Sequence, residues 1–173
     1  MSHHSNDPSA LLEDMTGRAT TPFAIREDDL SGEDTRSLLA FHLQQMHAHS
    51  PAGSAFALDL SGLQVPEVSV WTAWLDTHVV AIGALKDLGE ATGELKSMRT
   101  HPDYLRRGAA SVMLDHLIAV ARLRGMYRLS LETGSGPAFE AALALYRKRG
   151  FTQGEAFGGY TPSPFNQFFH LAL

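Results

Sequence analysis

Hydrophobic and polar residues alternate imperfectly along two neighbouring stretches of the chain, and both are rich in β-branched or aromatic residues. Residues 68–75 (VSVWTAWL) and 78–85 (HVVAIGAL) each predict a strand. Only Asp76 and Thr77 separate them, so the two strands should pair in antiparallel fashion. A third strand is expected at 92–100 (TGELKSMRT). The middle of the chain therefore predicts a three-stranded meander.

A helical period precedes this meander. Ser31 resembles an N-cap with Asp34 three residues on, and Pro51 ends the helix. The stripe of this helix consists of Leu38, Leu39, Phe41, His42 and Met46. A short edge strand is expected at 23–26 before the helix, and residues 51–66, with several Gly and Pro, are expected to be irregular.

A second helix follows the meander, with Gly125 as its C-cap. Its apolar face has the spacing i, i+3, i+4, i+7 and i+11, at Ala110, Met113, Leu114, Leu117 and Ala121. Residues 128–132 (RLSLE) then predict a strand. The strand–helix–strand unit 92–132 should place two parallel strands in one sheet through a right-handed crossover.

A third helix should open at Pro137, a favoured first-turn residue, and close at Gly150. Its apolar side is expected to be Ala138, Ala141, Ala142, Leu145 and Tyr146. Residues 151–153 and 165–173 predict a final strand pair around a loop rich in Gly and Pro. The expected fold is α/β, with a mixed, mostly antiparallel central sheet and helices on both faces.

Composition narrows the function classes. The chain has 173 residues, 44% of them hydrophobic, which suits one domain at 23–173 preceded by a flexible polar arm at 1–22. A net charge of -5 argues against a general nucleic-acid binder. The absence of cysteine excludes disulfides and thiolate chemistry. No apolar run approaches the ~20 residues of a membrane helix, and no signal pattern is present. We expect a cytoplasmic protein that binds no membrane.

The segment 94–117 carries the clearest chemical signal. A strand ends at Thr100, and RRGAAS at 106–111 then leads into the second helix. Small residues there leave the first helical N–H groups uncovered, and the helix dipole favours an anion. Arg106 and Arg107 add charge, so a pyrophosphate fits this helix start. The same residues also suit an ordinary strand–turn–helix connection with two solvated arginines.

Two blocks in this order resemble the acetyl-CoA-binding half of GNAT N-acetyltransferases. Gly108 and Ala110 match the two small positions of the family's first motif, whereas Leu105 departs from its Gln/Arg position. Tyr146 and Gly150-Phe151 match the second block. The resemblance covers about 94–153 and implies the GNAT fold, with acetyl-CoA as acyl donor.

The resemblance also implies where acetyl-CoA binds. The pantetheine arm should bond the backbone at Met98 and Thr100, and the pyrophosphate should lie over the amides of 107–111. The thioester should enter a splay between strands 92–100 and 128–132. The implied cofactor-binding residues are Met98, Thr100, Arg106, Arg107, Gly108, Ala109, Ala110 and Ser111.

Three residues are candidates for catalysis. Tyr146 matches the family tyrosine near the thioester sulfur and could protonate the leaving thiolate; otherwise it is a core tyrosine. Glu94, fourteen positions before Gly108, is the candidate general base, acting directly or through water. Two-residue alternation would place Glu94, Lys96 and Met98 on one strand face. Lys96 could instead pair with Glu94, and Glu132 is the rival base.

The acceptor is expected to be a primary amine of a small molecule or peptide, with the first helix, residues 47–60 and the C-terminal loop as pocket walls. A catalytically silent acyl-CoA sensor on the same fold is the alternative, and homodimerisation is left open. A toxin acting on aminoacyl-tRNA fits poorly with the acidic charge. His42 and His47 do not share a helical face, and no metal motif is present, so no metal site is expected.

Overall fold

The meander predicted at the centre of the chain forms the middle of a seven-stranded sheet. The computed structural model describes residues 21–173. Its central strands are β2 (Val68–Leu75), β3 (His78–Gly89) and β4 (Thr92–Thr100), paired in antiparallel fashion. Strand β1 (Ala24–Glu27) lies on the outer edge of β2. Strand β3 runs four residues past its predicted end, because Glu90 and Ala91 adopt positive φ values of 53° and 56° that make a tight hairpin to β4.

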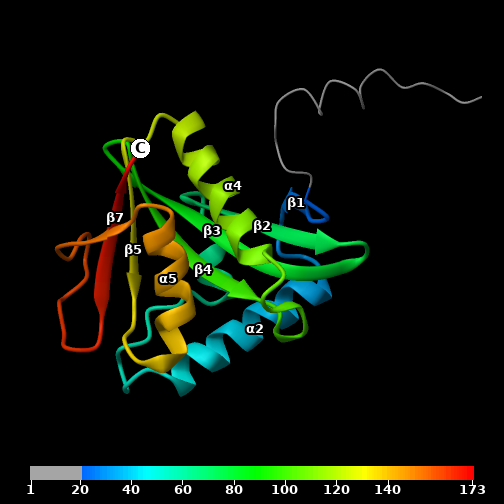
Figure 1. Cartoon of the computed structure of the whole chain (residues 1–173), viewed down its shortest axis with the longest axis horizontal. Coiled ribbons are helices and arrows are strands. Elements are labelled where there is room, and N and C mark those ends of the chain that lie inside the picture. Colours follow the sequence, from blue (N-terminus) through cyan, green and yellow to red (C-terminus); the bar gives the residue numbers. More distant parts are fainter. Residues whose placement is uncertain (1–20) are drawn as a thin grey trace, which may run out of the picture.

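The second half of the sheet begins with the parallel neighbour of β4. Helix α4 (Ala109–Leu123) connects β4 to β5 (Arg128–Thr133), and these two strands are parallel as predicted. Antiparallel strands β7 (Gln167–Ala172) and β6 (Thr152–Gln153) complete the order β1-β2-β3-β4-β5-β7-β6. The expected mixed, mostly antiparallel α/β fold is confirmed (Figure 1).

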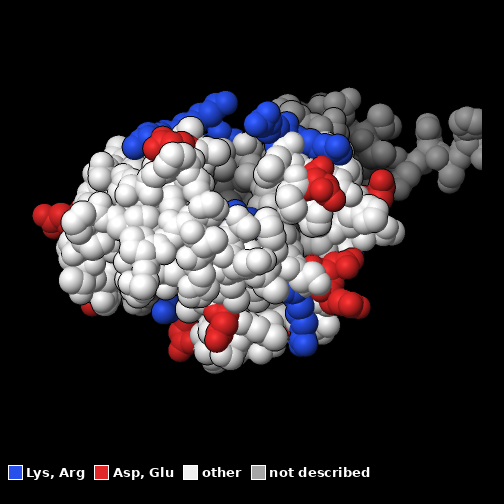
Figure 2. All heavy atoms as spheres, turned by 90° about the horizontal axis from the view of Figure 1, so that it is seen from below, with Lys and Arg blue, Asp and Glu red and all other residues white. Residues whose placement is uncertain are grey.

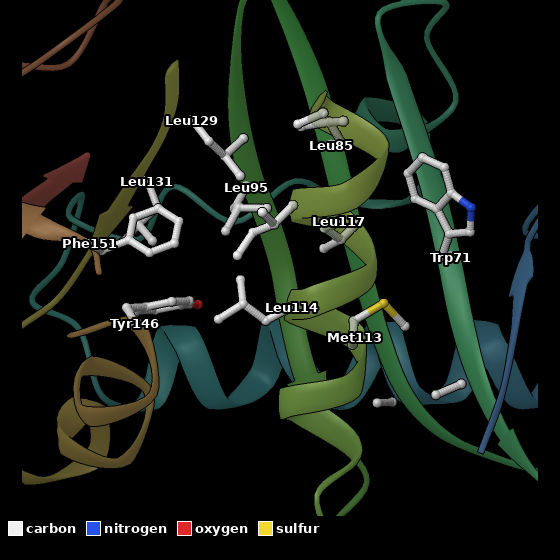
Figure 3. Packing of buried hydrophobic residues seen from close by; sticks show 14 of the residues in the cluster. Trp71, Leu85, Leu95, Met113, Leu114, Leu117, Leu129, Leu131, Tyr146 and Phe151 are labelled. Carbon is white, nitrogen blue, oxygen red and sulfur yellow. The ribbon is translucent and has the colours of Figure 1, made fainter. Parts of the chain in front are cut away.

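Helices cover both faces of this sheet. Helices α4 and α5 (Glu140–Lys148) lie on one face, where their apolar residues share a single core with β3, β4 and β5 (Figure 3). Helix α2 (Glu33–Ala48) lies on the other face and packs through Leu38 and Leu39. The end of β4 therefore lies between α4 and α5 on one face of the sheet and α2 on the other.

Local details differ from the sequence-based expectation at three places. The N-cap of α2 is Gly32 instead of Ser31, because the Ser31 amide and hydroxyl bond the Asp29 carboxylate at 3.0 and 2.6 Å. Residues 51–66 are not wholly irregular, since α3 (Leu60–Leu63) forms where the Asp59 side chain caps it.

The third difference is the buried face of α5. Pro137 opens a 3-10 turn (Pro137–Phe139) before α5, and this turn changes the helical phase. Phe139, Leu143 and Tyr146 are buried, whereas the predicted Ala138 and Ala141 are exposed. Larger apolar side chains thus take the core face, which still contains Tyr146.

Two further expectations concern the N-terminal arm and membrane-spanning helices. Most of the predicted flexible arm, residues 1–20, lies outside the described residues. Among residues 21–173, no helix has the length and apolar character needed to cross a membrane.

Candidate active site

Strands β4 and β5 separate after a short paired stretch, and a cavity lies where they diverge. Their parallel register covers only Thr92–Glu94 opposite Arg128–Ser130. Beyond it, residues 95–99 of β4 and 131–133 of β5 line a cavity of about 380 Å³. Helices α2 and α5 close two sides of it. The splay expected for a thioester is therefore present.

A β-bulge reshapes β4 at this opening. The pairing with β3 skips from Ala84↔Lys96 to Ile82↔Arg99, and Ser97 adopts φ 56°. The bulge breaks two-residue alternation. Met98 packs toward α4 instead of sharing a face with Glu94 and Lys96, which corrects the predicted arrangement.

The predicted anion site lies at the start of α4. Gly108 is the N-cap, with φ 88°, which favours glycine, and no side chain caps the helix. The first intrahelical bond runs from the Val112 amide to the Gly108 carbonyl at 3.1 Å, so the amides of 109–111 precede any helical partner. This bare helix start can hold an anion.

The remaining predicted cofactor residues surround this start. Arg106 is exposed at φ 62°, and the Arg107 guanidinium stands 5.2 Å from the ring centroid of Tyr104. Thr100 pairs with Ala81 at the end of β4. Seen from below, Lys and Arg side chains gather along one edge of the molecule despite its negative net charge (Figure 2).

Tyr146 lines the cavity from α5 and is buried. Figure 3 shows its hydroxyl directed toward Leu114 of α4. Its ring meets Phe151 edge-on at 5.7 Å. Its hydroxyl has no hydrogen-bond partner among residues 21–173. Burial raises the pKa of Tyr146 to about 12, although the charge of Arg99 acts in the opposite direction. The phenol therefore stays protonated near neutral pH and can donate.

Glu132 lines the same cavity from the end of β5. Its Oε2 is buried and has no hydrogen-bond partner in the described part of the chain. Burial raises the pKa of Glu132 to about 7, while the charge of Lys96 lowers it and that of Glu94 raises it. A carboxyl group of this kind can exchange a proton near neutral pH.

The family model described as "Acetyltransferase (GNAT) family" matches residues 33–151. The chain belongs to the GNAT acetyltransferase family. It is 45% identical over 151 residues to the uncharacterized N-acetyltransferase YedL of Escherichia coli, covering 87% of this chain and 95% of that one. It is 32% identical over 136 residues to the [ribosomal protein bS18]-alanine N-acetyltransferase of Escherichia coli, covering 76% and 84%.

Solved structures agree with this assignment. A Klebsiella pneumoniae protein described as an acyl-CoA N-acyltransferase superposes on this chain with a TM-score of 0.74 at 27% identity. The match covers 87% of this chain and 97% of that one. A Bacillus subtilis acetyltransferase in complex with CoA has a TM-score of 0.66 at 16% identity, covering 87% and 99%, and shares the fold. This GNAT chain is an acyltransferase.

Glu94 of this GNAT chain lies behind the cavity wall. Its carboxylate is buried and accepts hydrogen bonds from Lys96 Nζ at 3.2 Å and from the Tyr160 hydroxyl. Lys96 Nζ also donates to Tyr160 Oη at 2.8 Å. The pairing of Glu94 with Lys96, which the sequence left open, is present. It occupies Oε1 of Glu94, the residue that the sequence favoured as general base.

Sequence reasoning did not single out Tyr160. It lies on the C-terminal loop, beyond the stretch that matches the family model, and lines the cavity. Burial and the charge of Glu94 raise the pKa of Tyr160 well above its ordinary range. Phe56 meets its ring edge-on at 5.3 Å, so residues 47–60 and the C-terminal loop both form cavity walls, as expected.

Arg99 and His42 form the α2 side of the cavity and were also not predicted as a pair. Arg99 Nε donates to His42 Nδ1 at 3.0 Å. Burial, and secondarily the charge of Arg99, lowers the pKa of His42 to about 3, so His42 is neutral near pH 7. Burial also lowers the pKa of Arg99.

Proposed function

We propose that this protein transfers an acetyl group from acetyl-CoA directly to the primary amine of a small molecule or peptide. The observation that carries the proposal is one cavity at the splay of β4 and β5 that is lined by both Glu132, whose Oε2 is buried without a hydrogen-bond partner in the described part of the chain, and the protonated phenol of Tyr146. The bare start of α4 and the GNAT family assignment support acetyl-CoA as the acyl donor.

In this proposal the chain holds acetyl-CoA at two places. The amides of 107–111, with Arg106 and Arg107 beside them, bind the pyrophosphate at the start of α4. The backbone of Met98 and Thr100 bonds the pantetheine arm along the end of β4. These residues fit an anionic, extended molecule because the helix start lacks a capping side chain and Gly108 opens onto free space.

Glu132 is the proposed general base. An alkylammonium with a pKa near 10 must lose a proton before its nitrogen can attack. Glu132 lines the cavity with a free oxygen, whereas Glu94 is already bonded to Lys96 and Tyr160. The structure therefore favours the rival base over Glu94, whose role becomes that of positioning Lys96 and Tyr160.

The proton balance of the reaction uses both groups. Glu132 accepts one proton from the ammonium, and the amine nitrogen then forms a bond to the thioester carbonyl carbon. As the carbon–sulfur bond breaks, Tyr146 donates its proton to the sulfur. The second proton from the new amide nitrogen restores Tyr146, and Glu132 returns its proton to water. The products are an N-acetylated amine, CoA and one proton.

A screen of CoA release tests the function. Acetyl-CoA is incubated with amino acids, polyamines, aminoglycosides and peptides, and wild type is compared with Tyr146→Phe. The proposal expects at least one class to give CoA together with an N-acetylated product. A protein that binds acetyl-CoA tightly but turns over none of these acceptors would be the catalytically silent acyl-CoA binder instead.

A further inference from the structure

The cavity contains two cations, and only one of them has a carboxylate partner. Lys96 Nζ lies 3.2 Å from Glu94 Oε1, and both side chains are nearly inaccessible to solvent, at 9% and 5% exposure. No carboxylate pairs with Arg99 within residues 21–173. Its guanidinium donates only through Nε, to the neutral ring of His42, so both terminal nitrogens remain without a protein acceptor.

The described residues around Arg99 offer its positive charge no compensating negative charge. Its guanidinium stands 5.9 Å from the ring centroid of Phe41, and its charge acts on the Tyr146 phenol. None of Phe41, His42 and Tyr146 carries a negative charge near pH 7. A partly buried cation without a counter-charge is costly in free energy, and an anion bound at its terminal nitrogens would offset that cost.

The anion is not the pyrophosphate expected at α4. Arg99 bonds α2, whereas the preceding Met98 packs toward Met113 and Leu117 of α4. The bulge at Ser97 sets this arrangement, so Arg99 faces the side of the sheet opposite the helix start. A group bound there belongs to the acceptor half of the cavity.

We propose that Arg99 binds the carboxylate of the acceptor, and that the acceptor is a free amino acid with an apolar side chain. The planar guanidinium fork matches a carboxylate. In an α-amino acid the amine is adjacent to the carboxylate, which brings it toward Tyr146. Met46, Phe56 and Phe139 supply apolar walls for the side chain. This inference rests on the proposed function and excludes polyamines and aminoglycosides, which lack a carboxylate.

Matched acceptor pairs provide the test. Initial rates of CoA release are measured with phenylalanine, leucine and methionine and with the amide of each. Amino amides lose their ammonium proton more easily, so intrinsic reactivity opposes the expected preference. We expect kcat/KM to favour at least one acid over its amide by ~100-fold, the scale of a lost charge-assisted interaction. Arg99→Met should reduce that ratio below ~5, and Arg99→Lys should recover part of it.

Arg26→Met is the matched control. The Arg26 guanidinium also stands over an aromatic ring, 4.9 Å from the centroid of Trp74, but Arg26 is exposed and does not line the cavity. Its acid-to-amide ratio should equal that of wild type. A wild-type ratio near one for every pair, or an undiminished ratio in Arg99→Met, would overturn the assignment.

A binding arm separates this inference from the proposed reaction. The thermal shift of CoA-saturated protein is measured with N-acetylphenylalanine, N-acetylleucine and N-acetylmethionine and with their amides. Stabilisation by an acid but not by its amide, lost in Arg99→Met, supports the carboxylate site whether or not any acceptor is turned over. The absence of turnover would refute only the transfer reaction. Equal shifts for acids and amides, or no shift with any of them, would count against the site.

Discussion

Replacement of Glu132 by Gln has consequences for both stability and activity, and their signs follow from one pKa. The pKa of Glu132 is about 7, against an ordinary value of 4.5, because the side chain is buried. Between these values the folded protein binds a proton that the unfolded chain releases. The contribution of Glu132 to the free energy of unfolding is therefore present in full below pH 4.5 and is lost as pH rises through about 7.

The size of the stability effect can be bounded. A difference of about 2.5 between the two pKa values corresponds to at most roughly 3–4 kcal/mol at 1.36 kcal/mol per unit. Glu132 is only partly buried, so solvent screening reduces this to about 1–2 kcal/mol. Glu132→Gln removes this titration. The stability of the variant relative to wild type should therefore be higher at pH 8 than at pH 4 by that amount. For a chain of this size the gain is a Tm increase of roughly 2–8 °C.

The assay combines thermal melts with a pH–rate profile. Melts of wild type and Glu132→Gln are recorded from pH 4 to 8, with the exposed Glu155→Gln as control. The same proteins are then assayed for kcat/KM. Wild type should lose activity as pH falls through about 7, and Glu132→Gln should lose about 10²–10⁴-fold at pH 8 together with that acidic limb. A pH-independent Tm difference, or an intact limb in Glu132→Gln, would refute the reasoning.

Three further predictions concern the same site. Tyr146→Phe should lower kcat by about 10²–10⁴-fold with little change in acetyl-CoA affinity, since the hydroxyl acts as the thiolate leaves; wild-type kcat in a chemistry-limited assay would reduce Tyr146 to a packing residue. Gly108→Glu should abolish acetyl-CoA binding in calorimetry, because it adds negative charge and a strained left-handed residue at the helix start; retained heat would contradict this. Glu94→Gln should move the acidic limb of kcat/KM to lower pH and Lys96→Met should move it to higher pH, because Glu94 raises and Lys96 lowers the pKa of Glu132; shifts in the same direction would exclude Glu132 as the titrating base.

The fold and the uncapped start of α4 were predictable because their signals are local. Alternation and helical spacing identified the meander and the face of α4. A glycine between arginines and small residues marked the helix start, where Gly108 indeed adopts φ 88°. Each of these features depends on a few neighbouring residues, which the sequence displays directly.

The arrangement within the cavity was less predictable because it depends on distant contacts. The bulge at Ser97 has no local marker, since serine rarely adopts a positive φ, and it moves Met98 to the opposite face. Tyr160 bonds Glu94 across 66 positions of sequence. The raised pKa of Glu132 arises from burial in the assembled fold, which no motif encodes.

Direct transfer of the acetyl group is the central claim, and isotope tracing tests it most directly. The protein is incubated with acetyl-CoA labelled in the acetyl group, with and without amino-acid acceptors, and the mass of both protein and acceptor is measured. The account predicts the label on the acceptor's amine nitrogen in equal amount to the CoA released, with the protein's mass unchanged in either case. Label retained on the protein before the acceptor is added, or CoA released without any acetylated amine, would contradict it.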